Sequence, residues 1–222
     1  PLVCANCAGT KLKRLRLGVN RAREELEALA GEPVGELTAD TSVDEIERHR
    51  ITVGTEALLH RVHGAAVVCF LDFDQELLAS RYRAAEQAMA LLIRAARLVS
   101  ADGGRVMVQT RTPDHRTLVA AERSDPPRLA EAEREIRQAV GFPPFGALAE
   151  VSGKGAEAML EPLLDSKRSR SSVGSMAATV LGPRPDGRYL VRAETPDLLA
   201  DVLDHLDRPK ERVRVAVDPP RV

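Results

Sequence analysis

The sequence predicts an α/β protein with a second, smaller α+β domain toward its C-terminal end. Short apolar runs rich in β-branched residues alternate with longer amphipathic segments over residues 17–124, which is typical of a parallel sheet with helical crossovers. Pro143 and Pro144 then interrupt the chain, because a helix cannot continue through two prolines. After this break the pattern restarts in the order β-α-β-β-α-β, which predicts a small layered α+β domain.

Local residue patterns define the elements of the first part. Leu26 and Leu29 share one face of a helix over 18–30, and Gly31 to Pro33 ends that helix. Thr41 to Asp44 offers an N-cap for a short helix. The predicted strands are 34–37, 51–53, 67–71 and 105–109, and the predicted helices are 43–48, 81–99 and a short one containing 118–122.

The second part begins at Asp125, where two prolines mark a break before a charged helix. The segment from Gly141 to Gly146 is the clearest domain boundary, and its two phenylalanines are expected to anchor the turn. The predicted elements are a helix over 128–139, strands at 147–151, 179–181, 189–192 and 213–217, helices at 156–164 and 196–206, and a loop at 166–175.

Composition limits the possible functions of the chain. The formal net charge of −1 gives no basic footprint for the whole protein, which argues against a pure DNA-binding module. No apolar run reaches the roughly 18–20 residues that a membrane span needs, so we expect a cytoplasmic protein that does not contact membranes. The chain starts at Pro1 without an initiator methionine, and we interpret it as a piece of a longer chain.

Two sets of residues have metal-ligand spacing. Cys4 and Cys7 have the two-residue gap that lets both thiolates bind one tetrahedral zinc ion, and the alternative is a loop with two free thiols. Cys69 lies inside an apolar strand and is expected in the core. His60 and His63 can share a helix face with a metal, but a polar loop is the simpler interpretation.

The end of the strand at 51–53 and the end of the strand at 67–71 carry further candidate residues. Gly54 and Thr55 predict a tight turn, whose backbone N–H groups can contact a phosphate or a nucleic acid. Asp72 and Asp74 can act as acid and base, but at i and i+2 of a strand end they are expected to cap the following turn.

Several of these motifs together resemble one known family. The segments 4–23, 52–86, 104–118 and 141–145 are similar, in order and spacing, to the primosomal protein N′ family of replication restart helicases, the PriA family. The resemblance implies four parts: 1–16 as the end of a zinc-binding region, 17–124 as the second helicase lobe, 125–142 as a linker helix and 143–222 as a C-terminal domain similar to ribosomal protein S10. It also implies that Cys4 and Cys7 bind zinc together with cysteines upstream of this chain.

The helicase lobe departs from the family pattern where an arginine finger is expected. In the family, the pattern Gly-Arg-Ala-Gly-Arg comes shortly before a strand with the pattern Gly-x-Val-x-x-Gln-Thr. The strand pattern matches residues 104–110 of this chain. Counting back without a gap, the Gly-Arg-Ala-Gly-Arg pattern falls on Ala95-Ala96-Arg97-Leu98-Val99, so neither glycine and neither arginine is kept. Loss of an arginine finger lowers the rate of phosphoryl transfer by roughly 10³–10⁵. We therefore expect a degenerate helicase lobe and regard ATP as a doubtful cofactor.

The resemblance implies a replication restart factor that recognises stalled, forked or single-stranded DNA, associates with the nucleoid and recruits single-stranded DNA-binding protein and other primosome proteins. The alternatives are an active ATP-dependent 3′-5′ DNA helicase of the same family, and a stand-alone α/β protein without a role on DNA. Basic residues can neutralise phosphates, although a solvated loop is the common alternative. The candidates for DNA contact are Lys11, Lys13, Arg14, Arg16, Lys167, Arg168 and Arg170.

Overall fold

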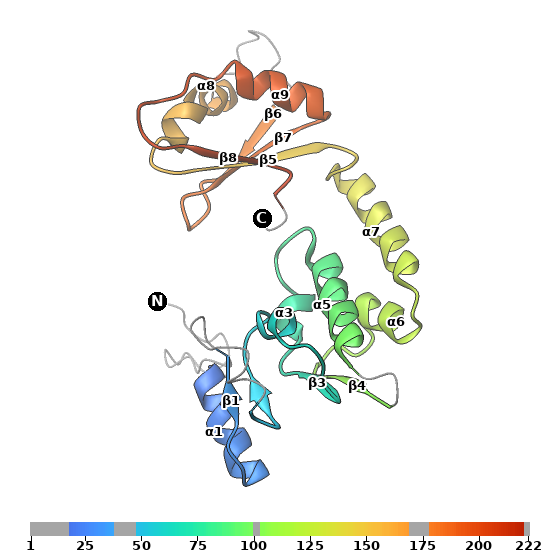
Figure 1. The fold of residues 1–222 in the computed structure, drawn as a ribbon. Helices are drawn as coiled ribbons and strands as arrows, with labels where there is room; N and C mark the ends of the chain where they lie inside the picture. The colour runs from blue at the N-terminus through green and yellow to red at the C-terminus, as the bar shows by residue number, and fades with distance from the viewer. Residues whose placement is uncertain (1–17, 38–47, 100–102, 169–177, 220–222) are drawn as a thin grey trace, which may run out of the picture. The chain divides into compact units, whose positions relative to one another are not determined.

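The computed structural model describes residues 18–37, 48–99, 103–168 and 178–219 (Figure 1). The chain divides into two compact units. The first is formed within Pro1–Gln75 and Ala88–Pro113, and the second within Glu76–Gln87 and Asp114–Val222. The boundary that the sequence predicts at residue 143 stays a prediction.

The first unit contains two pairs of parallel strands. Strand β1 (Gly35–Glu36) pairs with β2 (Thr52–Val53), and β3 (Val67–Phe70) pairs with β4 (Arg105–Val108). The α/β class and the parallel pairing are confirmed, but the described strands form two separate pairs, whereas the sequence predicted one sheet. The helices that begin before residue 113 are α1 (Val19–Ala30), α3 (Leu58–Arg61), α4 (Asp74–Leu77) and α5 (Ala84–Leu98).

Helix α5 buries one face. Ala88, Met89, Leu92 and Ala95 recur at helical spacing and are all buried, between 0% and 6% exposed. At the end of the helix, the backbone N–H of Ala65 donates to the carbonyl of Leu98 at 2.9 Å. The apolar stripe and this contact fix α5 beside the segment that leads into β3.

The prediction that Cys69 lies in the core is wrong. Cys69 is exposed, and so is Met107, which faces it in register on β4 and is 55% exposed. An unbroken apolar run normally indicates a strand buried on both faces. Here the burial alternates along β3 and β4, so that Val67 and Cys69 fall on the more exposed face.

Two helices of the second unit follow the sequence signals closely. Helix α6 spans Arg116–Glu122 and α7 spans Pro126–Val140. The Asp125 side chain caps α7 by accepting a hydrogen bond from the backbone N–H of Arg128 at 3.3 Å. Gly141 ends α7 with a φ of 62°, a left-handed conformation that glycine adopts without steric cost.

The remaining elements form a four-stranded antiparallel sheet with two helices. The element order is β5 (Ala147–Ser152), α8 (Ala156–Arg168), β6 (Ala178–Leu181), β7 (Tyr189–Ala193), α9 (Pro196–Asp204) and β8 (Arg214–Val217). The strand order is β6-β7-β5-β8, and α8 and α9 lie on one face of the sheet (Figure 1). The predicted β-α-β-β-α-β order is therefore present.

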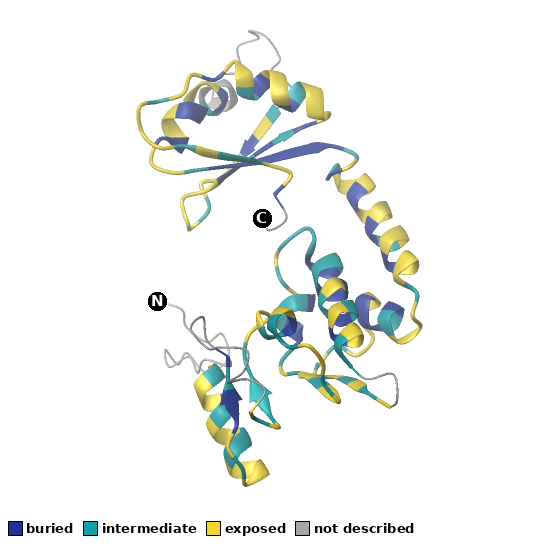
Figure 2. Cartoon of the chain, viewed as in Figure 1, coloured by how far each residue is buried: buried dark blue, intermediate teal, exposed yellow. Residues whose placement is uncertain are grey.

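The core of this sheet lies under the two helices. Figure 2 shows buried segments on the strands of this sheet and on the helices that cover it. Val151, Val191 and Leu160 are completely buried and belong to one cluster with Leu199 of α9. Helix α8 continues to Arg168, so the loop predicted to begin at residue 166 begins later, and Pro162 does not end the helix. Most of the predicted loop, like most of the predicted helix 43–48, lies outside the described residues.

Among the described segments, no helix has both the length and the apolar character that are required to cross a bilayer.

Candidate functional site

Gly54 and Thr55 lie at the predicted strand end. They follow β2, and the backbone N–H of Leu58 donates to the carbonyl of Thr55 at 2.9 Å as α3 begins. A Cβ atom on Gly54 would lie 3.0 Å from the Cβ of Leu37, so the packing of this turn against Leu37 favours glycine. The glycine of this motif therefore has a packing role in the fold.

Most of the other predicted site residues cannot be placed. The residues that lie outside the described part of the chain are Cys4, Cys7, Lys11, Lys13, Arg14, Arg16 and Arg170. Lys167 and Arg168 form the last turn of α8, where only the backbone is described. His60 lies in α3 and His63 follows the end of that helix. Within the described ranges, no group of three or more His, Cys, Asp or Glu side chains is placed to hold a metal ion.

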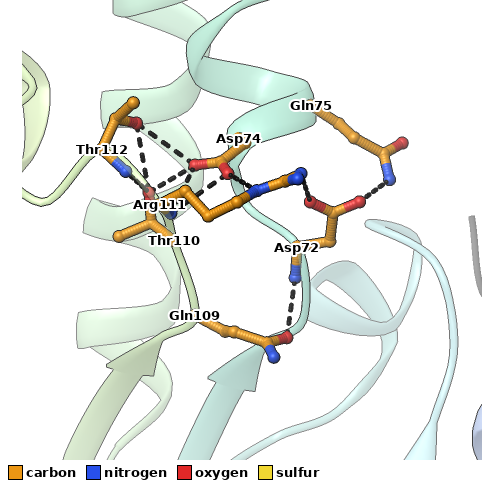
Figure 3. A network of polar contacts seen from close by, with 7 residues as sticks. All are labelled: Asp72, Asp74, Gln75, Gln109, Thr110, Arg111 and Thr112. Atoms are coloured by element: carbon orange, nitrogen blue, oxygen red, sulfur yellow. Dashed lines mark hydrogen bonds and ion pairs between the residues drawn. The ribbon is translucent and has the colours of Figure 1, made fainter. Parts of the chain in front are cut away.

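A polar network lies where the segments after β3 and β4 meet (Figure 3). The two strands are parallel, with Phe70 in register with Val108, so their carboxyl ends lie at the same edge. This edge is the usual position of ligand sites in parallel α/β sheets. Gln109 connects the two segments. Its backbone N–H donates to the carbonyl of Phe70 at 2.9 Å, and its side-chain Oε1 accepts from the backbone N–H of Asp72 at 3.2 Å.

Asp74 is the centre of this network (Figure 3). Its buried carboxylate accepts hydrogen bonds from the hydroxyl groups of Thr110 and Thr112, from the backbone N–H of Arg111 at 3.1 Å and from Arg111 Nε at 3.0 Å. The bond from Thr110 lowers the pKa of Asp74 to about 2, against the opposing effect of burial and with further lowering by Arg111 and Thr112. Asp74 is therefore ionised at physiological pH and is not suited to proton transfer.

Arg111 lies between two carboxylates. Its Nη2 atom is 3.4 Å from Oδ1 of Asp72. The other carboxylate oxygen of Asp72, Oδ2, accepts a hydrogen bond from the Gln75 side chain at 2.6 Å. The ion pairs with Asp74 and Asp72 raise the pKa of Arg111, and 70% of its side chain is exposed. The network thus fixes a solvent-facing guanidinium at the carboxyl edge of the β3–β4 pair. Such an arrangement can position a cation toward an anionic ligand.

Asp72 accepts from the side chain of Gln75 in the segment after β3, whereas the described bonds of Asp74 run to the segment after β4. The prediction that both residues cap the turn after β3 is therefore not confirmed. The sequence interpretation missed their partners Thr110, Arg111 and Thr112. The predicted parallel pairing of the two strands could have indicated these partners, because polar residues that follow two neighbouring parallel strands meet at one edge of the sheet.

The segment that aligns with the arginine-finger pattern is helical. Ala95 to Leu98 form the last turn of α5, and Ala95 is completely buried. Arg97 is exposed. Alanine and leucine favour helix far more than the two glycines of the family pattern do, so the substitutions extend α5 across this segment.

Comparison with known proteins gives two informative relatives. The chain is 37% identical over 159 residues to a probable replication restart protein PriA from Mycobacterium leprae, an alignment that covers 68% of this chain and 24% of the relative. It is 27% identical over 206 residues to the replication restart protein PriA of Haemophilus influenzae, covering 83% of this chain and 28% of that protein. No protein-family model matches the chain.

The aligned part amounts to about a quarter of the length of these relatives. The same family is indicated by the motif order in the sequence and by the two curated relatives. The chain belongs to the PriA replication restart family.

Proposed function

We propose that this chain serves as the C-terminal part of a replication restart factor that binds forked or single-stranded DNA and does not unwind it with ATP. The restart role is supported by the names of the two relatives, both replication restart proteins. The lack of unwinding is supported by one structural observation. Helix α5 runs without a break to Leu98, through the segment where the family pattern has an arginine finger.

Neither position at which the family pattern has an arginine carries one in this chain. An arginine finger has to reach the γ-phosphate from a position that faces the nucleotide. The two arginines of the family pattern would fall on Ala96 and Val99, and Arg97 is one position from the first and two positions from the second. One helical position turns a side chain by about 100°, so Arg97 points in a different direction from a finger.

Two further features belong to the proposal. Cys4 and Cys7 provide two of the four ligands of a tetrahedral zinc site, and the other two are proposed to come from cysteines outside this sequence. The basic residues near both cysteines and at the end of α8 are proposed to contact phosphates. Single-stranded DNA-binding protein and other primosome proteins are the proposed partners, in the nucleoid region of the cytoplasm.

Binding of forked DNA tests this function directly. We expect the chain to bind a labelled fork in fluorescence anisotropy, with an affinity that falls as salt rises. Replacing Lys11, Lys13, Arg14 and Arg16 together with glutamine should weaken binding and reduce the slope of log K against log salt concentration. Replacing Arg21 and Arg23 of α1 with glutamine serves as a control, although it removes only two charges. Absence of fork binding by the folded chain would overturn the proposal.

A further inference from the structure

The second unit contains a cavity of about 500 Å³ that none of the preceding sites uses. Its volume lies within the range of about 300–1,000 Å³ that is typical of small-ligand sites. Four parts of that unit line it: the segment before α5, the turn after α7, the strands β5, β6 and β7, and the loop between β6 and β7. The lining residues are Ala79, Ser80, Arg81, Tyr82, Phe142, Leu148, Leu181, Gly182, Arg184, Leu190 and Arg192.

The cavity lies on the face of the four-stranded sheet that points away from α8 and α9. Side chains alternate between the two faces of a strand. Val191 of β7 and Ala149 of β5 belong to the core cluster under the helices, whereas Leu190, Arg192 and Leu148 line the cavity. The register supports this division, because Leu148 is opposite Arg192 and Leu181 is opposite Leu190.

The walls of the cavity combine aromatic and aliphatic groups. The rings of Tyr82 and Phe142 lie 5.5 Å apart between centroids at an angle of 57°. Leu181 also lines the cavity and is 43% exposed. An apolar wall with aromatic rings and an accessible edge is suited to a flat, partly apolar ligand group.

The charge of the cavity is positive. Of the described residues that line it, three are arginines and none is acidic. Arg81 is paired with Glu76 at 2.7 Å. Within the described part of the chain no carboxylate forms an ion pair with Arg184 or Arg192, so two guanidinium groups lack an acidic partner.

Arg192 is held in place by neutral groups. Its Nη2 donates to the carbonyl of Val140 at 2.6 Å, at the end of α7, and its guanidinium lies 5.2 Å from the ring centroid of Phe142. Arginine carries five N–H donors in a planar arrangement. The carbonyls therefore occupy only part of its hydrogen-bonding capacity, and the charge of Arg192 stays available to an anion beside an aromatic ring.

We propose that this cavity binds one nucleotide unit of a single DNA strand, with the base against Phe142 and Leu181 and the phosphate beside Arg184 and Arg192. Proteins that bind single strands without sequence preference combine such stacking surfaces with cationic grooves. The proposal rests on the proposed function, which it makes specific by naming a site on the open face of the β6-β7-β5-β8 sheet.

Two substitutions test the site in the complete chain. Leu181→Glu puts a carboxylate at the exposed edge, and Arg184→Gln removes one cation without breaking a described ion pair. The probe is a fluorescein-labelled oligothymidylate, measured by anisotropy over a range of salt concentrations. We expect Leu181→Glu to weaken binding at least about fivefold. Arg184→Gln should reduce the magnitude of the salt slope by about 0.7, the value for one phosphate contact on a single strand.

Matched controls use the same chemical changes at exposed positions outside the cavity. Arg208→Gln removes a cation from the same unit, and Leu29→Glu alters a side chain on α1 that is 84% exposed. Both controls should bind oligothymidylate like the unsubstituted chain. Thermal unfolding followed by circular dichroism shows that all four variants are folded.

The outcomes separate this proposal from the proposed function. If the cavity variants bind oligothymidylate like the controls while the chain still binds forked DNA, the cavity assignment is wrong and the proposed function stands. If the folded chain binds neither DNA, both are overturned. Binding of an acidic peptide that Leu181→Glu abolishes, with oligothymidylate binding unchanged, would also overturn the assignment and give the cavity to a protein partner.

Discussion

The Nε atom of Arg111 lies 3.0 Å from the Asp74 carboxylate, and this ion pair connects the segment after β4 to the segment after β3. The two residues are 37 positions apart in sequence, so the contact closes a long loop of chain. Because Thr110 and Thr112 donate to the same carboxylate, the charge of Asp74 is balanced mainly by donors from one short segment.

Replacing Asp74 with asparagine should lower the thermal unfolding temperature of the chain. The amide cannot accept all the bonds that the carboxylate accepts, so donors of Thr110 and Arg111 would lose their partner, and the ion pair with Arg111 would be removed. Asp72→Asn is the matched control, because Asp72 is more exposed and its contact with Arg111 is longer, at 3.4 Å. An unfolding temperature that falls equally in both variants would contradict the central role of Asp74.

The same carboxylate predicts how stability depends on pH. The pKa of Asp74 is lowered from its ordinary 3.8 to about 2 in the folded chain. Its stabilising contribution is therefore complete above pH 3.8 and is lost as the pH falls from 3.8 toward 2. Urea unfolding between pH 6 and pH 2.5 should show a shallower loss of stability for Asp74→Asn than for the unsubstituted chain. Parallel pH profiles for the two proteins would refute the assignment.

The complete gene product should hydrolyse ATP slowly, even with forked DNA. Loss of an arginine finger costs roughly 10³–10⁵ in rate, and α5 occupies the segment of that finger. A coupled phosphate-release assay with and without a fork measures the rate. Fork-stimulated hydrolysis at ordinary helicase rates would favour the active 3′-5′ helicase instead.

Zinc should bind this chain weakly. Cys4 and Cys7 supply two thiolates, and a structural zinc site takes four ligands. We expect zinc to be lost on dialysis against a mild chelator, as measured by elemental analysis. A longer version of the protein that carries further cysteine pairs should retain it. Tight stoichiometric zinc on this chain alone would refute a shared site.

Residues 143–222 should fold on their own. The core cluster that includes Val151, Leu160, Val191 and Leu199 lies entirely within this range, and the sheet and both of its helices are complete there. Expressed alone, the segment should unfold in a single cooperative thermal transition. A gradual loss of signal on heating would place the boundary elsewhere.

The elements with strong local signals were predictable from sequence. Asp125 followed by two prolines marks the start of α7, Gly141 marks its end, and the short segments predicted as strands at 147–151 and 189–192 match β5 and β7. Local residue patterns determine such boundaries, because caps and turn residues act within one helical turn. The β-α-β-β-α-β order followed from these boundaries alone.

Burial and side-chain partners depend on contacts that are distant in sequence. Cys69 has the apolar neighbours of a core residue, yet one face of β3 is exposed. The bonds of Asp74 to Thr110 and Arg111 depend on the register between β3 and β4, which the residues of either strand do not reveal. The cavity beside Phe142 and Leu181 was missed for the same reason, since its walls come from separate segments of the chain.

The unbroken course of α5 also bears on how the family pattern could return during evolution. Restoring Gly-Arg-Ala-Gly-Arg at residues 95–99 would put glycine at position 95, inside the helix, and at position 98, its last residue. A helix-interior glycine destabilises a helix by about 1 kcal/mol relative to alanine, so the change at position 95 would lower the stability of α5. A variant that regains the pattern one residue at a time is therefore expected to lose stability when glycine enters at position 95.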